Sequence, residues 1–151
     1  MKYIKMYESS VIDILIDYIK NDKTKEIKDL IESGVDVNMS NKNGNTALMY
    51  AAAFNKDILI KILIKAGAKL DTQNNYDKTA LIYASKSYNS EYIHIEIIKL
   101  LIDAGADWNI KDEDDRDFLY YLDKKKDFII DLYPEQYKNY LIKKDSGKYN
   151  L

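Results

Sequence analysis

Residues 41–71 read NKNGNTALMYAAAFNKDILIKILIKAGAKLD, and this stretch decides the fold because much of it occurs twice. The segment TALMYA at residues 46–51 returns as TALIYA at residues 79–84, which is 33 residues later. Before the first copy stands the turn-forming sequence Asn-Gly at residues 43–44, and after it comes a second, more apolar helical segment at residues 58–64. A period near 33 residues that combines a turn with two short helices is typical of a solenoid of stacked repeats.

Three glycines follow the same spacing. Gly34 and Gly67 are 33 residues apart, and Gly105 follows after another 38. Each glycine ends an apolar helical segment, where its freedom to take a left-handed conformation is useful. The longer spacing indicates five additional residues somewhere in residues 87–92, which we expect to lie between the paired helices of one unit. The pattern predicts a single domain made of units at about residues 9–37, 38–70, 71–108 and 109–133, followed by a C-terminal extension at 134–151.

Both ends of the array are predicted to diverge from the repeat. Residues 1–8 look like a short lead-in, with Ser9 or Ser10 placed to cap the first helix. The first unit lacks a hairpin turn of its own. At the other end, Pro134 cannot continue a helix without strain, so we expect the last short helix to stop there and a further helix to cover about residues 135–144.

The repeated units resemble the ankyrin repeat, most closely over residues 35–109. The family's Thr-Pro-Leu-His motif stands here as Thr-Ala-Leu-Met at residues 46–49 and Thr-Ala-Leu-Ile at residues 79–82. Because Met49 and Ile82 replace histidine, the hydrogen bonds of the family's Thr–His pair are expected to be missing and the hairpin tips to be looser. The resemblance implies an all-α ankyrin-repeat solenoid of about four helix-turn-helix units, with β-hairpin-like tips and divergent capping units at both ends.

Ankyrin arrays generally bind another protein through a concave face made by hairpin tips and first helices, and the resemblance implies the same for this chain. Such a face requires a few aromatic or arginine anchors within a polar rim. Carried over by position, the exposed tip residues are Lys42, Asn43, Asn45, Asn75, Tyr76, Lys78, Glu113, Asp114 and Arg116, preceded by Gln73 and Lys111, while Phe54, Lys86 and Ser87 project from the first helices.

Three aromatic residues and one acidic run in the repeats have different expected roles. Tyr76 is the strongest single candidate, because its turn does not need a tyrosine and tyrosine is favoured at interface centres. Phe54 either faces the concavity or packs against its neighbour. Trp108 replaces aliphatic residues of the sister units, so we expect it to be buried. The acidic residues 112–115 either grip a basic partner segment or form a solvated loop.

The composition argues against several other classes of protein, including nucleic-acid-binding, membrane and secreted proteins. With 46% hydrophobic and 32% charged residues the chain is expected to be globular, and its formal net charge of −2 gives no reason for nucleic-acid binding. No apolar run reaches membrane-spanning length, the N-terminus lacks a secretory signal, and there is no cysteine. We therefore expect a cytoplasmic protein, monomeric and not bound to a membrane.

The sequence disfavours catalysis. His94 is the only histidine, and neither a nucleophile elbow, a phosphate-binding glycine loop nor a dinucleotide fingerprint occurs, so no cofactor is expected. Because no second domain is evident, an inhibitor or immunity-type factor that masks a partner's surface is a specific form of the binding hypothesis. Two alternatives stay open: an assembly protein that self-associates through an exposed end around Tyr133, Tyr137 and Tyr140, and a small hydrolase that uses His94.

Overall fold

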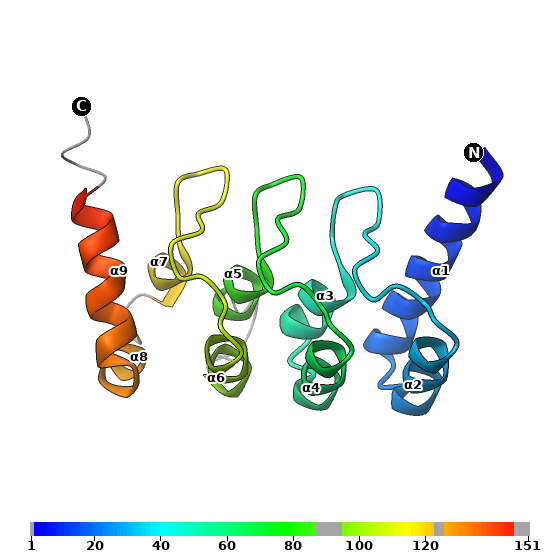
Figure 1. Ribbon diagram of the computed structural model, residues 1–151, viewed down its shortest axis with the longest axis horizontal. Helices are drawn as coiled ribbons and strands as arrows, with labels where there is room; N and C mark the ends of the chain where they lie inside the picture. The colour runs from blue at the N-terminus through cyan, green and yellow to red at the C-terminus, as the bar shows by residue number, and fades with distance from the viewer. Residues whose placement is uncertain (1, 87–94, 123–125, 147–151) are drawn as a thin grey trace.

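The computed structural model describes residues 2–86, 95–122 and 126–146, and within these ranges the chain forms nine α-helices (Figure 1). Ser87, His94 and the whole of residues 87–92, which the sequence singled out, lie outside the described residues. The helices are α1 (Lys2–Lys20), α2 (Thr24–Glu32), α3 (Ala47–Ala53), α4 (Asp57–Lys65), α5 (Ala80–Ser85), α6 (Ile95–Asp103), α7 (Phe118–Leu122), α8 (Lys126–Leu132) and α9 (Pro134–Ser146).

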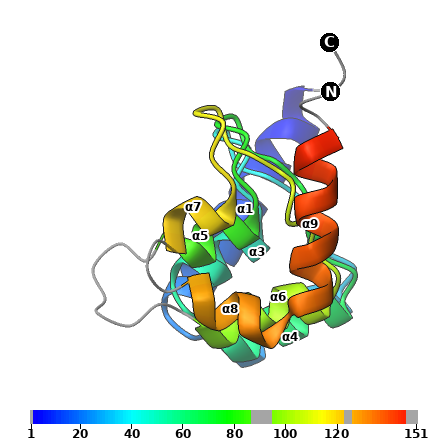
Figure 2. The same cartoon turned by 90° about the vertical axis from the view of Figure 1, so that its left-hand side faces the viewer.

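The helices stack in pairs along one direction, and three hairpin-like tips project to the same side of the row (Figure 1). Because the first unit has no tip, each tip is numbered by its unit: the second tip is residues 41–45, the third is 74–78 and the fourth is 112–116. Viewed from the C-terminal end, α3, α5 and α7 follow one another, while α4 and α6 form a second row below them (Figure 2). Helix α3 packs on both α1 and α5, and α5 packs on α7, so the main contacts of the described helices are between neighbouring units. The predicted all-α solenoid with hairpin-like tips is confirmed, whereas the boundaries of its units stay predictions.

The two copies of the threonine motif have the same local structure. Thr46 (φ −90°, ψ 167°) and Thr79 (φ −96°, ψ 172°) both precede a first helix in extended conformation. The hydroxyl of Thr46 accepts a hydrogen bond from the amide of Met49 at 3.4 Å, and the hydroxyl of Thr79 accepts one from the amide of Ile82 at 3.3 Å. Each threonine therefore caps its helix.

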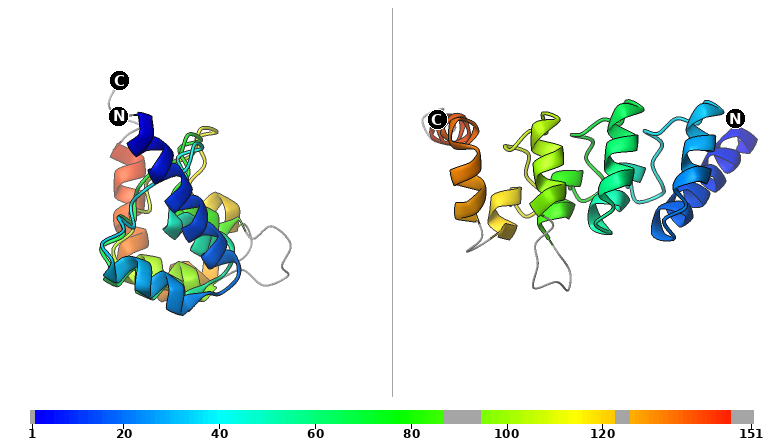
Figure 3. Two further views of the ribbon diagram at one scale, coloured as in Figure 1. Left: turned by 90° about the vertical axis from the view of Figure 1, so that its right-hand side faces the viewer. Right: turned by 90° about the horizontal axis from the view of Figure 1, so that it is seen from below.

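The core runs through the whole stack rather than filling one centre. Small residues such as Ala51 and Ala84 are fully buried between first helices, which lets those helices approach closely, and Leu63 of α4 is fully buried below them. Seen from below, the second helices line up side by side (Figure 3). Trp108 is 5% exposed and meets Phe118 edge-on at a centroid distance of 5.1 Å, which confirms that it is buried.

The N-terminal end differs from the expectation. Helix α1 begins at Lys2, so residues 2–8 are not a lead-in, and Ser9 and Ser10 lie inside the helix instead of capping it. The physical reason is that this segment contains no glycine or proline to interrupt a helix. In Figure 1, α1 rises to the height of the tips and takes the place of the tip that the first unit lacks.

The C-terminal end follows the expectation. Helix α8 ends at Leu132, and α9 begins at Pro134 and runs to Ser146. Proline suits the first helical position, because its missing amide hydrogen would have no partner there. Helix α9 stands beside the fourth tip at the end of the row (Figure 1).

Candidate functional site

Each tip is built around one asparagine or aspartate. Asn41, Asn74 and Asp112 occupy equivalent positions, and one side-chain oxygen of each accepts the backbone amides found two and four residues later, at N···O distances from 2.9 to 3.2 Å. A short polar side chain that binds its own backbone in this way holds a tight turn in one conformation. All three tips therefore share the same internal bracing.

A tyrosine on the first helix completes each tip, nine residues after the bracing side chain. The Nδ2 amide of Asn41 donates to the hydroxyl of Tyr50 at 3.0 Å, and that of Asn74 donates to the hydroxyl of Tyr83 at 3.0 Å. In the fourth unit the direction reverses, because the hydroxyl of Tyr121 donates to the carboxylate of Asp112. The missing Thr–His hydrogen bonds are thus replaced by a different set, which sequence reasoning overlooked. The recurrence of Tyr50 and Tyr83 within the repeated hexapeptide was the available signal.

The tips are also bonded to one another. The amide of Asn75 donates to the carbonyl of Asn43 at 3.1 Å, and the amide of Glu113 donates to the carbonyl of Tyr76 at 3.2 Å. Gly44 (φ 75°) allows this approach, because a Cβ there would lie only 2.9 Å from the backbone nitrogen of Asn75. The three tips consequently form one connected edge.

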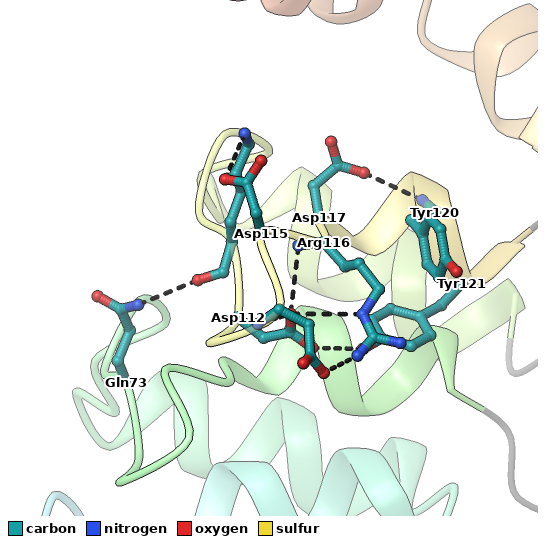
Figure 4. Close-up of polar contacts among 9 residues, drawn as sticks. Gln73, Asp112, Asp115, Arg116, Asp117, Tyr120 and Tyr121 are labelled. Atoms are coloured by element: carbon teal, nitrogen blue, oxygen red, sulfur yellow. Dashed lines mark hydrogen bonds and ion pairs between the residues drawn. The ribbon is translucent and has the colours of Figure 1, made fainter.

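The fourth tip carries a cluster of charges, shown in Figure 4. Asp112 is buried, and the Nε atom of Arg116 lies 3.8 Å from its carboxylate, while the Arg116 guanidinium also pairs with Asp114. Asp115 pairs with Lys111 at 2.7 Å. The acidic run is therefore not simply a solvated loop, because its first carboxylate is buried and two others are paired within the tip.

Burial and the hydrogen bond to Asp112 raise the pKa of Tyr121 to about 12. Asp117 is only 7% exposed and accepts hydrogen bonds from the amide of Tyr120 at 3.0 Å and the hydroxyl of Tyr140 at 2.7 Å. Asp112 and Asp117 are therefore not surface carboxylates. Both bind tyrosine hydroxyls inside the array, where they hold helices and tips together.

Most of the predicted contact residues do lie on the surface of the tips and first helices. Asn45, Lys78 and Arg116 are half-buried rather than exposed, because each lies two residues before the start of a first helix, where the chain folds back onto the array. Lys86 is half-buried too. The exposed members of the predicted set are Lys42, Asn43, Phe54, Gln73, Asn75, Tyr76, Lys111, Glu113 and Asp114.

Two aromatic side chains, Phe54 and Tyr76, are exposed on the first helices and the tips. Phe54 is 44% exposed and stacks on Tyr50 with a centroid distance of 6.2 Å, so it packs against a neighbour and still presents an open face. Tyr76 is 45% exposed, with the Lys78 ammonium 5.2 Å from its ring centroid. Beside Phe54 lies a hollow of about 100 Å³, lined by Asn45, Met49, Tyr50, Ala53, Phe54 and Tyr83.

A family model described as ankyrin repeats (3 copies) matches residues 11–112, which is more than half of the chain. This chain belongs to the ankyrin repeat family. Ankyrin repeats generally mediate protein–protein interaction and are typically non-enzymatic scaffolds. A search of curated proteins found no match. Across the described ranges of this ankyrin array, no helix combines the length and the apolar character needed to cross a membrane.

The C-terminal end of the array is less open than expected. Tyr133 and Tyr140 are 8% and 6% exposed, and their hydroxyls donate to Asp103 and Asp117, each at 2.7 Å. Burial and these carboxylate partners raise the pKa of both tyrosines. The expectation of an exposed tyrosine-rich end is therefore wrong for these two residues, which serve to hold α8 and α9 on the stack. Tyr137 is half-buried.

Proposed function

We propose that this ankyrin array binds a partner protein through the concave surface between its tips and the helices α3, α5 and α7. The observation that carries the proposal is Tyr76, an aromatic side chain that is 45% exposed on a tip whose backbone is bonded internally and to the next tip. A large amphipathic side chain held on a rigid element is a typical anchor of a protein interface. Phe54, which is 44% exposed and lines a hollow together with the tip residue Asn45, supplies a second anchor.

The polar surroundings fit the same role. Lys42, Asn43 and Asn75 are exposed on the tips and form a polar rim beside the aromatic residues. Lys86 places its ammonium 4.8 Å from the centroid of the Tyr121 ring, so a cation and an aromatic face lie together on the first-helix side. Aromatic anchors within a polar rim are the arrangement by which protein surfaces recognise other proteins.

The specific form of this proposal is an inhibitor or immunity-type factor, which acts by covering the functional surface of its partner. If the captured partner has a measurable activity, measuring that activity with and without the array tests the inhibitory role. We expect that activity to fall in proportion to the bound fraction as the array is added. A bound partner with unchanged activity would leave a binding scaffold but remove the inhibitory role.

The test compares two triple variants. Phe54→Ala, Tyr76→Ala and Lys86→Ala together remove side chains from the concave surface, whereas the matched control Phe128→Ala, Ile58→Ala and Lys61→Ala removes comparable exposed side chains from the second helices α4 and α8. Each variant is used as bait for affinity capture and mass spectrometry. We expect the partner to be lost only from the concave variant, with both variants retaining wild-type helical circular dichroism. Equal capture by the two variants would refute the assignment of the surface.

A further inference from the structure

The hollow beside Phe54 allows the partner's chemistry to be specified, on the basis of the proposed concave-surface function. We propose that it receives an aliphatic side chain from an acidic segment of the partner. Its walls combine the aromatic rings of Tyr50, Phe54 and Tyr83 with the small side chain of Ala53. Ala53 is the residue that opens the hollow, since the equivalent position of the next unit is occupied by Lys86.

The size of the hollow indicates which type of partner side chain can occupy it. Its volume is about 100 Å³, whereas a cavity of roughly 150 Å³ accommodates a benzene ring. A leucine, isoleucine or valine side chain therefore suits it better than an aromatic one. The apolar walls give such a side chain a favourable transfer from water, on the order of 1.5–3 kcal/mol for complete burial.

One polar group in the hollow points to an acceptor on the partner. The Oδ1 atom of Asn45 accepts from the Nδ2 atom of Asn74 at 2.6 Å and from the hydroxyl of Tyr83 at 3.2 Å. These two donors identify that atom as the oxygen, so the Nδ2 amide of Asn45 is left without an acceptor within the described part of the chain. A backbone carbonyl or a carboxylate that enters with the aliphatic side chain would accept its hydrogen bond.

The charges around the hollow favour an acidic segment. Helices α3, α5 and α7 contain neither aspartate nor glutamate. The Lys20 ammonium lies 5.8 Å from the ring centroid of Tyr50, which lines the hollow, while Lys86 and Arg116 lie over the ring of Tyr121 in α7. The carboxylates of the fourth tip are largely committed to Arg116 and Lys111. A partner carboxylate close to the hollow is thus attracted by this surface, and the attraction is screened only beyond about 8–10 Å in physiological salt.

The experiment is a selection of a phage-displayed random peptide library on the full chain, followed by calorimetry with the synthetic peptide that is most enriched. We expect enriched peptides to contain leucine, isoleucine or valine next to aspartate or glutamate. Ala53→Leu fills the hollow and should weaken binding of that peptide at least tenfold. The matched control Ala104→Leu adds the same volume at an exposed site outside the hollow and should leave binding unchanged.

A second variant keeps the inference testable if the Ala53→Leu protein does not fold. Asn45→Asp keeps the oxygen that accepts from Asn74 and Tyr83 but replaces the donating amide by a carboxylate oxygen, so it should also weaken binding about tenfold while the unfolding midpoint stays close to wild type. Basic or aromatic enriched peptides, no enriched peptide, or undiminished binding by both variants would overturn the inference. Those results leave the concave-surface proposal standing, because the triple variant at Phe54, Tyr76 and Lys86 tests it independently.

Discussion

The third and fourth tips have the same backbone hydrogen bonds, but the side chain that braces the turn is neutral in the third and a carboxylate in the fourth. In the third tip, Asn74 braces the turn, and its amide donates to Tyr83 and to Asn45 of the preceding unit. In the fourth tip, Asp112 braces the turn, accepts from Tyr121 and is compensated by Arg116. The same turn can therefore be closed by a neutral side chain or by a buried carboxylate.

The neutral and the charged tip need different partners. The asparagine supplies both an acceptor and a donor, so it links its own tip to the neighbouring unit without any charge. The aspartate supplies only acceptors, so it needs the Arg116 guanidinium and the Tyr121 hydroxyl as partners, and it forms no hydrogen bond to the preceding unit through its side chain among the bonds of the described residues. A buried charge of this kind is stable only while its partners stay in place.

The largest effect is expected when the third tip is given the charge of the fourth. Asn74→Asp replaces the donor that lies 2.6 Å from the Asn45 oxygen by an anionic acceptor at a site that is 5% exposed. Lys78 holds the position of Arg116, but its ammonium lies over the ring of Tyr76. We expect a loss of about 3 kcal/mol in the free energy of unfolding, measured by urea denaturation. A loss below about 1 kcal/mol would show that the two designs are interchangeable.

The reciprocal change should cost less. Asp112→Asn retains the oxygen that accepts the two backbone amides, and the new amide group can donate to Tyr121 as Asn74 does to Tyr83. Arg116 keeps its pairing with Asp114. We expect a loss of about 1 kcal/mol in the same urea experiment, since the Tyr121 hydroxyl loses its charged acceptor while the two backbone amides and the new side-chain amide keep partners. A larger loss than for Asn74→Asp would reverse the proposed asymmetry.

The smallest effect is a loss of wild-type stability that begins only when the pH rises above about 10. The pKa of Tyr121 is raised from 10.0 to about 12 by burial and by its hydrogen bond to Asp112. Between these values the unfolded chain loses the phenolic proton while the folded chain keeps it. The stability contributed by this hydroxyl is therefore complete below pH 10 and is lost as the pH approaches 12.

Tyr121→Phe isolates this contribution, because Tyr133 and Tyr140, whose pKa values are also raised, remain in both proteins. Urea denaturation at pH 9 and pH 11 should show a greater loss of unfolding free energy for the wild type than for the variant. Equal losses would mean that the Tyr121 hydroxyl titrates normally, which would contradict a stabilising hydrogen bond to Asp112 in the charged tip.

The fold could be predicted from sequence because its signals are local and repeated. The two copies of the threonine motif, the spaced glycines and the bulk of Trp108 each indicated a position that the structure confirms. The start of α1 could not be predicted well, since residues 2–10 contain no residue that excludes a helix and the paired serines imitate a cap.

For the candidate surface, the sequence predicted which residues lie on the tips but not which of them are buried or hydrogen-bonded. The burial of Asp112 and the half-burial of Arg116 depend on how the fourth tip folds back onto α7, which residue type alone does not reveal. The bonds between Asn74 and Tyr83 join residues of one unit, and their recurrence at the same spacing as Asn41 and Tyr50 was visible in the sequence. They were missed because tyrosines on a helix are ordinarily read as packing residues.

The backbone bonds from Asn75 to Asn43 and from Glu113 to Tyr76 have a thermodynamic consequence for any ligand. Loops that must be immobilised on association oppose binding through lost conformational entropy. Here the tips are already ordered by bonds to one another before a ligand arrives, so little of that entropy remains to be lost. The free energy of each new contact with a ligand is then offset only slightly by the cost of ordering the tips, so nearly all of it lowers the dissociation constant.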